Sequence, residues 1–151
     1  MKRLVSLFLI SFTFSLPAYS KPDVKVKLEN QKIILKDNKE IYESADKAQP
    51  GDTLVYRIVL TNVGDSEARK LQPVGNIPEG TTYIKEKYLY EALFSLDGKT
   101  FDKEPKIKVR EGNKEVLKPA TPDMYKKIKW LIDKPLKPNQ TLVISYKVKL
   151  K

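Results

Sequence analysis

Side-chain carboxylates are the first residues of this sequence whose types and spacing suggest chemistry. Asp65 and Glu67 lie two residues apart, and Asp97, Asp102 and Glu104 form a second acidic cluster. A pair of carboxylates can hydrolyse a glycosidic bond, one as a general acid and the other as a nucleophile or base. Both clusters fall in predicted turns, where solvated acids are common. We therefore interpret them as surface residues and expect no catalytic residue among them.

The second acidic cluster also resembles the start of a calcium loop. Asp97 and Asp102 bracket the run DGKTFD, but the run lacks the oxygen ligand at every second position that such a loop uses. Asp97 and Asp102 are kept only as weak calcium candidates. We expect no metal site and no cofactor.

The sequence contains no His and no Cys. It therefore cannot build a Ser-His-Asp triad, a Cys-His pair or a zinc site of the usual kind. Without Cys, the domain is also held together by core packing rather than by disulfides. These absences favour a protein that is not an enzyme.

The elements that would position these side chains are short strands. Residues 24–29 (VKVKLE) and 142–150 alternate apolar and polar side chains, which is typical of strands with one buried face. Asp97-Gly98 and Gly112-Asn113 lie between apolar runs and predict hairpins. All six glycines fall in predicted turns or breaks, and no segment has a sustained helical period. Further strands are predicted over residues 33–35, 41–42, 54–61, 71–74, 82–85, 88–95, 106–110, 115–118 and 127–132.

This pattern predicts an all-β fold, a sandwich of two antiparallel sheets with about seven to nine short strands. Trp130 is the only Trp, and we interpret it as a core residue that joins the two sheets. The alternative is a surface that stacks on sugars, and Tyr83, Tyr88 and Tyr90 are interaction candidates for the same role. The predicted core consists of Leu54, Tyr56, Ile58, Leu60, Trp130, Leu142, Ile144, Tyr146 and Val148.

The pattern of the first twenty residues predicts a secretory signal peptide. Lys2 and Arg3 precede the uncharged run 4–16, and Ala18 and Ser20 supply the small residues before a cleavage site. We expect cleavage after Ser20, an exported protein that is periplasmic or secreted, and no transmembrane anchor after cleavage. Residues 21–47 are then an N-terminal strand region, and residues 48–151 are the sandwich domain.

The mature chain is basic. Removing Lys2 and Arg3 leaves 29 − 2 = 27 basic residues against 19 acidic ones, a net charge of +8. The basic residues are mostly Lys, scattered along predicted strands, which is typical of solubility and of protected sheet edges. No compact basic cluster with interleaved aromatics occurs, so we expect no nucleic-acid partner. An anionic polymer of the cell surface stays open as a partner, beside an envelope protein.

Several motifs follow one another in a fixed order along residues 48–150. The run QPGDTLVY leads into a strand that ends in TNVGD, and IPEGTTY, SLDGKTF and a closing Trp130 follow. Together they resemble the conserved-repeat domain family, domain of unknown function 11. Asn139 stands where that family has a turn Gly, a mild change because Asn also accepts positive φ.

The resemblance implies an immunoglobulin-like domain of bacterial or archaeal envelope and secreted proteins, without general catalytic residues. We therefore expect a non-enzymatic structural or protein-interaction module. Its mechanism would be strand addition at an exposed edge, with residues 24–35 and 142–150 as the candidate edges. The alternative is a module that binds envelope polysaccharide through exposed aromatics and lysines.

Overall fold

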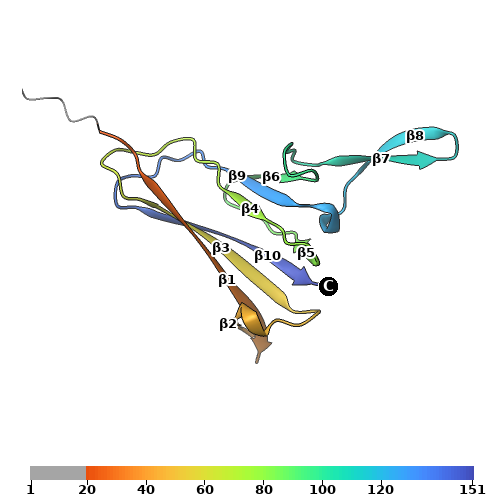
Figure 1. The fold of residues 1–151 in the computed structure, drawn as a ribbon, viewed down its shortest axis with the longest axis horizontal. Helices are drawn as coiled ribbons and strands as arrows, with labels where there is room; N and C mark the ends of the chain where they lie inside the picture. The colour runs from red at the N-terminus through yellow and green to blue at the C-terminus, as the bar shows by residue number, and fades with distance from the viewer. Residues whose placement is uncertain (1–19) are drawn as a thin grey trace, which may run out of the picture.

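The computed structural model describes residues 20–151 and contains ten strands, whose order in three sheets is given in Figure 1. The predicted signal peptide lies outside the described residues, except for Ser20. All strand pairs are antiparallel. The expected all-β sandwich is confirmed, with ten strands rather than seven to nine. They are β1 (Val24–Lys36), β2 (Lys39–Ser44), β3 (Thr53–Asn62), β4 (Val74–Asn76), β5 (Thr81–Ile84), β6 (Glu91–Ser95), β7 (Lys106–Glu111), β8 (Lys114–Pro119), β9 (Lys127–Leu131) and β10 (Thr141–Leu150).

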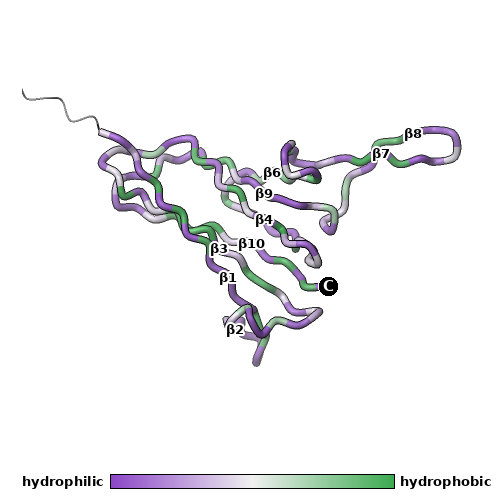
Figure 2. Tube along the Cα trace, in the orientation of Figure 1, coloured by the Kyte–Doolittle hydropathy of each residue, from purple (hydrophilic) through white to green (hydrophobic). Residues whose placement is uncertain are grey.

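The first sheet has the order β2-β1-β3-β10-β5, and the second has the order β4-β9-β6. The two sheets form the layers of the sandwich, whereas the β7–β8 hairpin projects beyond them (Figure 1). Figure 2 shows that the end of this hairpin is mostly hydrophilic. The only helical pieces in the described part of the chain are two short 3-10 turns, η1 (Ala45–Lys47) and η2 (Pro122–Met124).

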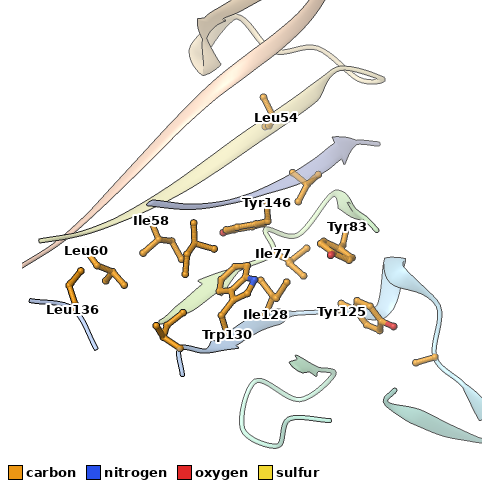
Figure 3. Packing of buried hydrophobic residues seen from close by; sticks show 14 of the residues in the cluster. Leu54, Ile58, Leu60, Ile77, Tyr83, Tyr125, Ile128, Trp130, Leu136 and Tyr146 are labelled. Atoms are coloured by element: carbon orange, nitrogen blue, oxygen red, sulfur yellow. The ribbon is translucent and has the colours of Figure 1, made fainter. Parts of the chain in front are cut away.

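The core lies between the first two sheets. The alternating residues of β3 and β10 face each other in register, for example Ile58 with Ile144 and Tyr56 with Tyr146. The rings of Trp130 and Tyr146 meet between β9 and β10, with centroids 5.6 Å apart (Figure 3). Every predicted core residue belongs to this cluster or packs against it, with Tyr56 and Leu142 only partly buried.

The residues with positive φ in the turns were predicted more accurately than the first and last residues of the strands. Asp37 and Asn38 have φ of 52° and 59° in the turn between β1 and β2, and Asn139 has φ of 63° at the predicted family turn. The predicted strand 71–74 is wrong, because β4 begins only at Val74. Pro73 has no N–H to donate, although its carbonyl still accepts from Trp130 N at 3.1 Å.

Candidate interaction edge

The first strand has a free edge over its N-terminal half. β1 pairs with β3 from Val24 to Ile33, but with β2 only from Gln31 to Lys36. Residues 24–30 therefore have one neighbouring strand among residues 20–151, and alternate backbone N–H and C=O groups point away from the sheet. We call residues 24–30 the open edge. An edge of this kind can accept a further strand through main-chain hydrogen bonds.

The length of the open edge is set by where β2 ends. The left-handed residues Asp37 and Asn38 reverse the chain, so β2 starts beside the C-terminal end of β1. β2 then stops at Ser44, whose hydroxyl accepts from Asp46 N at 3.4 Å and caps the 3-10 turn η1. Because the chain leaves the sheet there, no strand of the described part of the chain pairs with the outer side of the first seven residues of β1.

The open edge carries apolar side chains on its core-facing side. Val26 and Leu28 lie opposite Leu60 and Ile58 of β3 in register. Leu60 and Ile58 are each 3% exposed, whereas Val26 is 65% exposed and Leu28 is 59% exposed. The apolar row of the core thus continues onto β1 beyond the cover of the second sheet. Exposed apolar side chains beside an unpaired backbone are the two features that an added strand uses.

The opposite face of the open edge is charged. Lys25 and Lys27 alternate with the apolar residues and are exposed. Lys27 Nζ lies 2.8 Å from Glu29 Oε1, and this hydrogen bond and charge pair raise the pKa of Lys27 and lower the pKa of Glu29. Lys25 forms no ion pair with any residue that the structure describes. A strand added here would meet apolar side chains on one face and cations on the other.

The second predicted edge, residues 142–150, is wrong for its C-terminal half. β10 lies inside the first sheet, with β3 along Thr141–Lys149 on one side and β5 along Lys147–Leu150 on the other. The alternating lysines of β10 suggested an edge, but strand order is not encoded in the alternation of a single strand. Residues 141–146 have β3 as their one neighbouring strand among residues 20–151, but Val143 is their only largely exposed apolar side chain, so β1 is the stronger candidate edge.

The tyrosines predicted as interaction candidates do not form an exposed aromatic surface. Tyr83 is buried, with 2% of its surface exposed, and Tyr88 and Tyr90 are half-buried. The Tyr83 and Tyr88 hydroxyls are 2.9 Å apart and hydrogen-bonded, and burial raises the pKa of both. Tyr88 also packs edge-on against Trp130, which is fully buried. The interpretation of Trp130 as a core residue is therefore confirmed.

The acidic candidates are engaged in local hydrogen bonds. Asp97 Oδ1 accepts from Lys99 N and Thr100 N at 2.8 Å, and these bonds hold the pKa of Asp97 well below its usual range. Asp102 Oδ1 accepts from Glu104 N at 2.9 Å. Asp97 and Asp102 line one depression of about 400 Å³, but no group of three or more potential metal-ligating side chains occurs in the described residues.

Each carboxylate of the first acidic pair is also held by a hydrogen bond. Asp65 Oδ1 accepts from Lys21 N at 2.7 Å, and Glu67 Oε2 accepts from Arg69 at 2.6 Å. The two carboxylates therefore bind different groups rather than sharing a proton or a substrate position.

Sequence reasoning also missed a Ser-x-x-Lys motif, the spacing that Ser-Lys hydrolases use. It occurs at Ser44–Lys47. Ser44 Oγ donates to Asp46 Oδ2 at 3.2 Å, and Ser44 and Lys47 are the N-cap and the last residue of η1. This serine serves as a helix cap, and Lys47 makes no hydrogen bond to it.

Within residues 20–151, no helix is long and apolar enough to cross a membrane. The chain was also compared with known proteins. No protein-family model, curated protein or solved structure matches it. Resemblance to the conserved-repeat family therefore stays a prediction, and function has to be argued from the geometry of the chain itself.

Proposed function

We propose that this protein is a non-enzymatic interaction module of the cell envelope or the secreted fraction, an immunoglobulin-like member of the conserved-repeat family. It is exported, and the mature chain acts outside the cytoplasm. Its partner is an envelope protein that adds an extended segment to the open edge of β1. The added segment pairs with β1 on the side away from β3 and so adds a strand to the first sheet.

The observation that supports this function is that residues 24–30 combine a backbone edge without a second neighbouring strand in the described residues with exposed apolar side chains. The backbone of these residues is held extended by seven register pairs with β3, yet no strand within residues 20–151 pairs with its outer side. Val26 and Leu28 remain largely exposed beside a closed core. Lysines such as Lys25 and Lys27 are one device that protects an edge, but the core-facing residues here are Val and Leu rather than the inward-pointing charges that block strand addition.

The side-chain pattern of the open edge also specifies the chemistry of the partner. Val26 and Leu28 on the core-facing side favour apolar residues at alternate positions of the added strand. Lys25 and Lys27 on the other side favour Asp or Glu at the positions between. The partner segment is therefore an extended peptide that alternates apolar and acidic residues.

The experiment is affinity capture from an envelope extract of the source organism by the mature chain, by Leu28→Lys and by Val143→Lys. Leu28→Lys places a charge on the core-facing side of the edge, where it blocks strand addition. Val143 is 52% exposed against 59% for Leu28 and lies on β10, away from residues 24–30, so Val143→Lys is the matched control. Each eluate is analysed for protein and for glycan.

We expect the mature chain and Val143→Lys to retain one protein at a fixed ratio, and Leu28→Lys to lose it. Equal capture by Leu28→Lys contradicts strand addition at this edge. Recovery of polysaccharide without protein would instead favour the alternative function, binding to an envelope glycan or anionic surface polymer. Binding that disappears for all three chains in moderate salt would be due to the net charge of the chain.

A further inference from the structure

The residues before β1 are held against the turn that follows β3. Val63 N donates to Asp23 O at 2.7 Å, and Asp65 N donates to Lys21 O at 3.3 Å. A Cβ at Gly64 would lie 2.4 Å from both Asp23 N and Lys21 O, so the two backbones approach more closely than any other residue type allows. The backbone of residues 63–65 therefore fixes the position of Lys21 and the residues that follow it.

The carboxylate of Asp65 points at the backbone nitrogen of Lys21. Asp65 Oδ1 accepts from Lys21 N at 2.7 Å and from Ser20 Oγ at 3.0 Å. These two hydrogen bonds, with Lys21 N as the larger contribution, lower the pKa of Asp65. Asp65 is thus ionised at neutral pH and ready to bind a positive charge at this nitrogen.

The signal-peptide motif predicts that this same nitrogen becomes charged. Cleavage after Ser20 hydrolyses the Ser20–Lys21 amide: the C–N bond breaks, water gives OH to the Ser20 carbonyl, and the Lys21 nitrogen gains hydrogen. At neutral pH the new amine binds a further proton, since α-amino groups titrate near pH 7.7–8.0. The neutral amide donor beside Asp65 is replaced by an ammonium group.

We propose that Asp65 is the binding site for the new amino terminus that export creates. The ion pair anchors Lys21, three residues before the open edge begins, and so holds the first residues of β1 in register with Asn62. This inference rests on the proposed export of the protein, because cleavage after Ser20 supplies the charge. Processing by the signal peptidase then completes the interaction edge rather than only releasing the chain.

The test compares two amino termini in two backgrounds. One chain begins at Lys21, and the other carries one additional methionine before Lys21, which moves the amine away from Asp65. Each is made with Asp65 and with Asp65→Asn. Glu67→Gln is the control, because it removes one negative charge nearby without touching Lys21. The readout is the rate at which an acylating reagent labels the α-amine at pH 7, followed by mass spectrometry.

We expect the α-amine of the chain that begins at Lys21 to react about two- to fivefold more slowly than that of its Asp65→Asn variant, the range of an exposed ion pair. Glu67→Gln should react like the unsubstituted chain, and the methionine-extended chain should be indifferent to Asp65→Asn. Equal rates for Asp65 and Asp65→Asn in the chain that begins at Lys21 would overturn the proposal.

Amide hydrogen exchange at residues 24–30 provides a second readout. Protection at these residues should fall in Asp65→Asn relative to Glu67→Gln, with β9 and β10 unchanged. Loss of protection throughout the sheet would indicate unfolding and would overturn a local role for Asp65.

The amino terminus of the protein isolated from its source completes the test. A terminus other than Lys21 overturns this inference. It does not overturn strand addition at residues 24–30, whose own test is the loss of capture on Leu28→Lys.

Discussion

The ring of Tyr146 occupies the space that a side chain on Gly75 would need. A Cβ built on Gly75 lies 2.6 Å from Cε1 of Tyr146, and the Tyr146 hydroxyl donates to the neighbouring Asn76 carbonyl at 2.6 Å. Burial also raises the pKa of Tyr146, so the hydroxyl stays a donor throughout the physiological range. Through this one ring, β10 of the first sheet is joined to β4 of the second.

We predict that Gly75→Ala destabilises the protein by about 1–3 kcal/mol, because the added methyl overpacks the space beneath the ring. Urea unfolding monitored by Trp fluorescence measures the change. In a Tyr146→Leu background the same substitution should cost clearly less, since the two sites are in contact. Full additivity of the two changes would show that the ring is not the cause.

Asn62 connects three segments of the chain and is fully buried. Its Nδ2 donates to the carbonyls of Ser66 and Leu136 at 2.7 and 2.9 Å, and its Oδ1 accepts from Gly64 N at 3.0 Å. We predict that Asn62→Ala costs about 2–4 kcal/mol, because several buried polar groups lose their partner. Thermal unfolding measures this cost. Thr61→Ser, on the neighbouring residue, serves as the control and should be nearly neutral.

The pH dependence of the stability of the Asn62→Asp variant tests the same hydrogen bonds of the Asn62 side chain. A carboxylate facing two carbonyls has a folded pKa above its unfolded value, so the folded state of the variant is favoured at low pH. We expect the variant to be closest to wild type below about pH 3.9, the ordinary Asp pKa, and to lose stability as the pH rises through the folded pKa. A stability deficit that does not change with pH would contradict the hydrogen-bonding scheme.

Asp97 predicts the opposite pH dependence. Hydrogen bonds from Lys99 N and Thr100 N lower its pKa in the folded state. A lowered folded pKa means that the stabilising contribution is present above the unfolded value of about 3.9 and is lost as the pH falls below it. Asp97→Asn should therefore reduce the loss of stability on acidification, measured by urea unfolding at pH 7 and pH 3. Asp133→Asn, an exposed acid without a hydrogen-bond partner in the described residues, should leave that loss unchanged.

Trp130 is fully buried, and its Nε1 has no hydrogen-bond partner among the described residues. We predict that Trp130→Ala costs about 3–5 kcal/mol through lost packing. Trp130→Phe should cost less than half of that, because it keeps a ring against Tyr88 and Tyr146 and removes the unpartnered N–H. Circular dichroism during urea unfolding measures both variants. Equal costs for the two would contradict packing as the main contribution, since both variants remove the N–H.

The sequence predicted the core and the turns because both are local signals. The alternation of β3 and β10 marks which residues face inward, and Asn139 and Gly98 mark positions with positive φ. Trp130 was placed in the core by the same alternation. These assignments depend on a residue and its near neighbours along the chain.

The candidate site could be predicted only in part, because strand order depends on pairs far apart in sequence. Residues 24–35 were proposed as an edge, but alternation could not show that β2 covers only their C-terminal half. The same limit explains why the C-terminal half of β10, which pairs with β5, was wrongly placed at an edge. The roles of Asn62 and Asp65 depend on partners more than forty residues away, such as Leu136 and Lys21, so no local pattern indicated them.

The place of β10 inside the first sheet has a consequence for how the protein folds. β3 ends at Asn62, yet β10, which pairs with it, begins only at Thr141. β5 is connected to the first sheet only through its pairing with β10. Pairings between segments so distant in sequence form slowly. During synthesis, which proceeds from the amino terminus, the described residues before Thr141 cannot complete the first sheet. Folding of the first sheet is therefore completed only after β10 emerges, and until then β3 residues such as Ile58 lack their β10 partners.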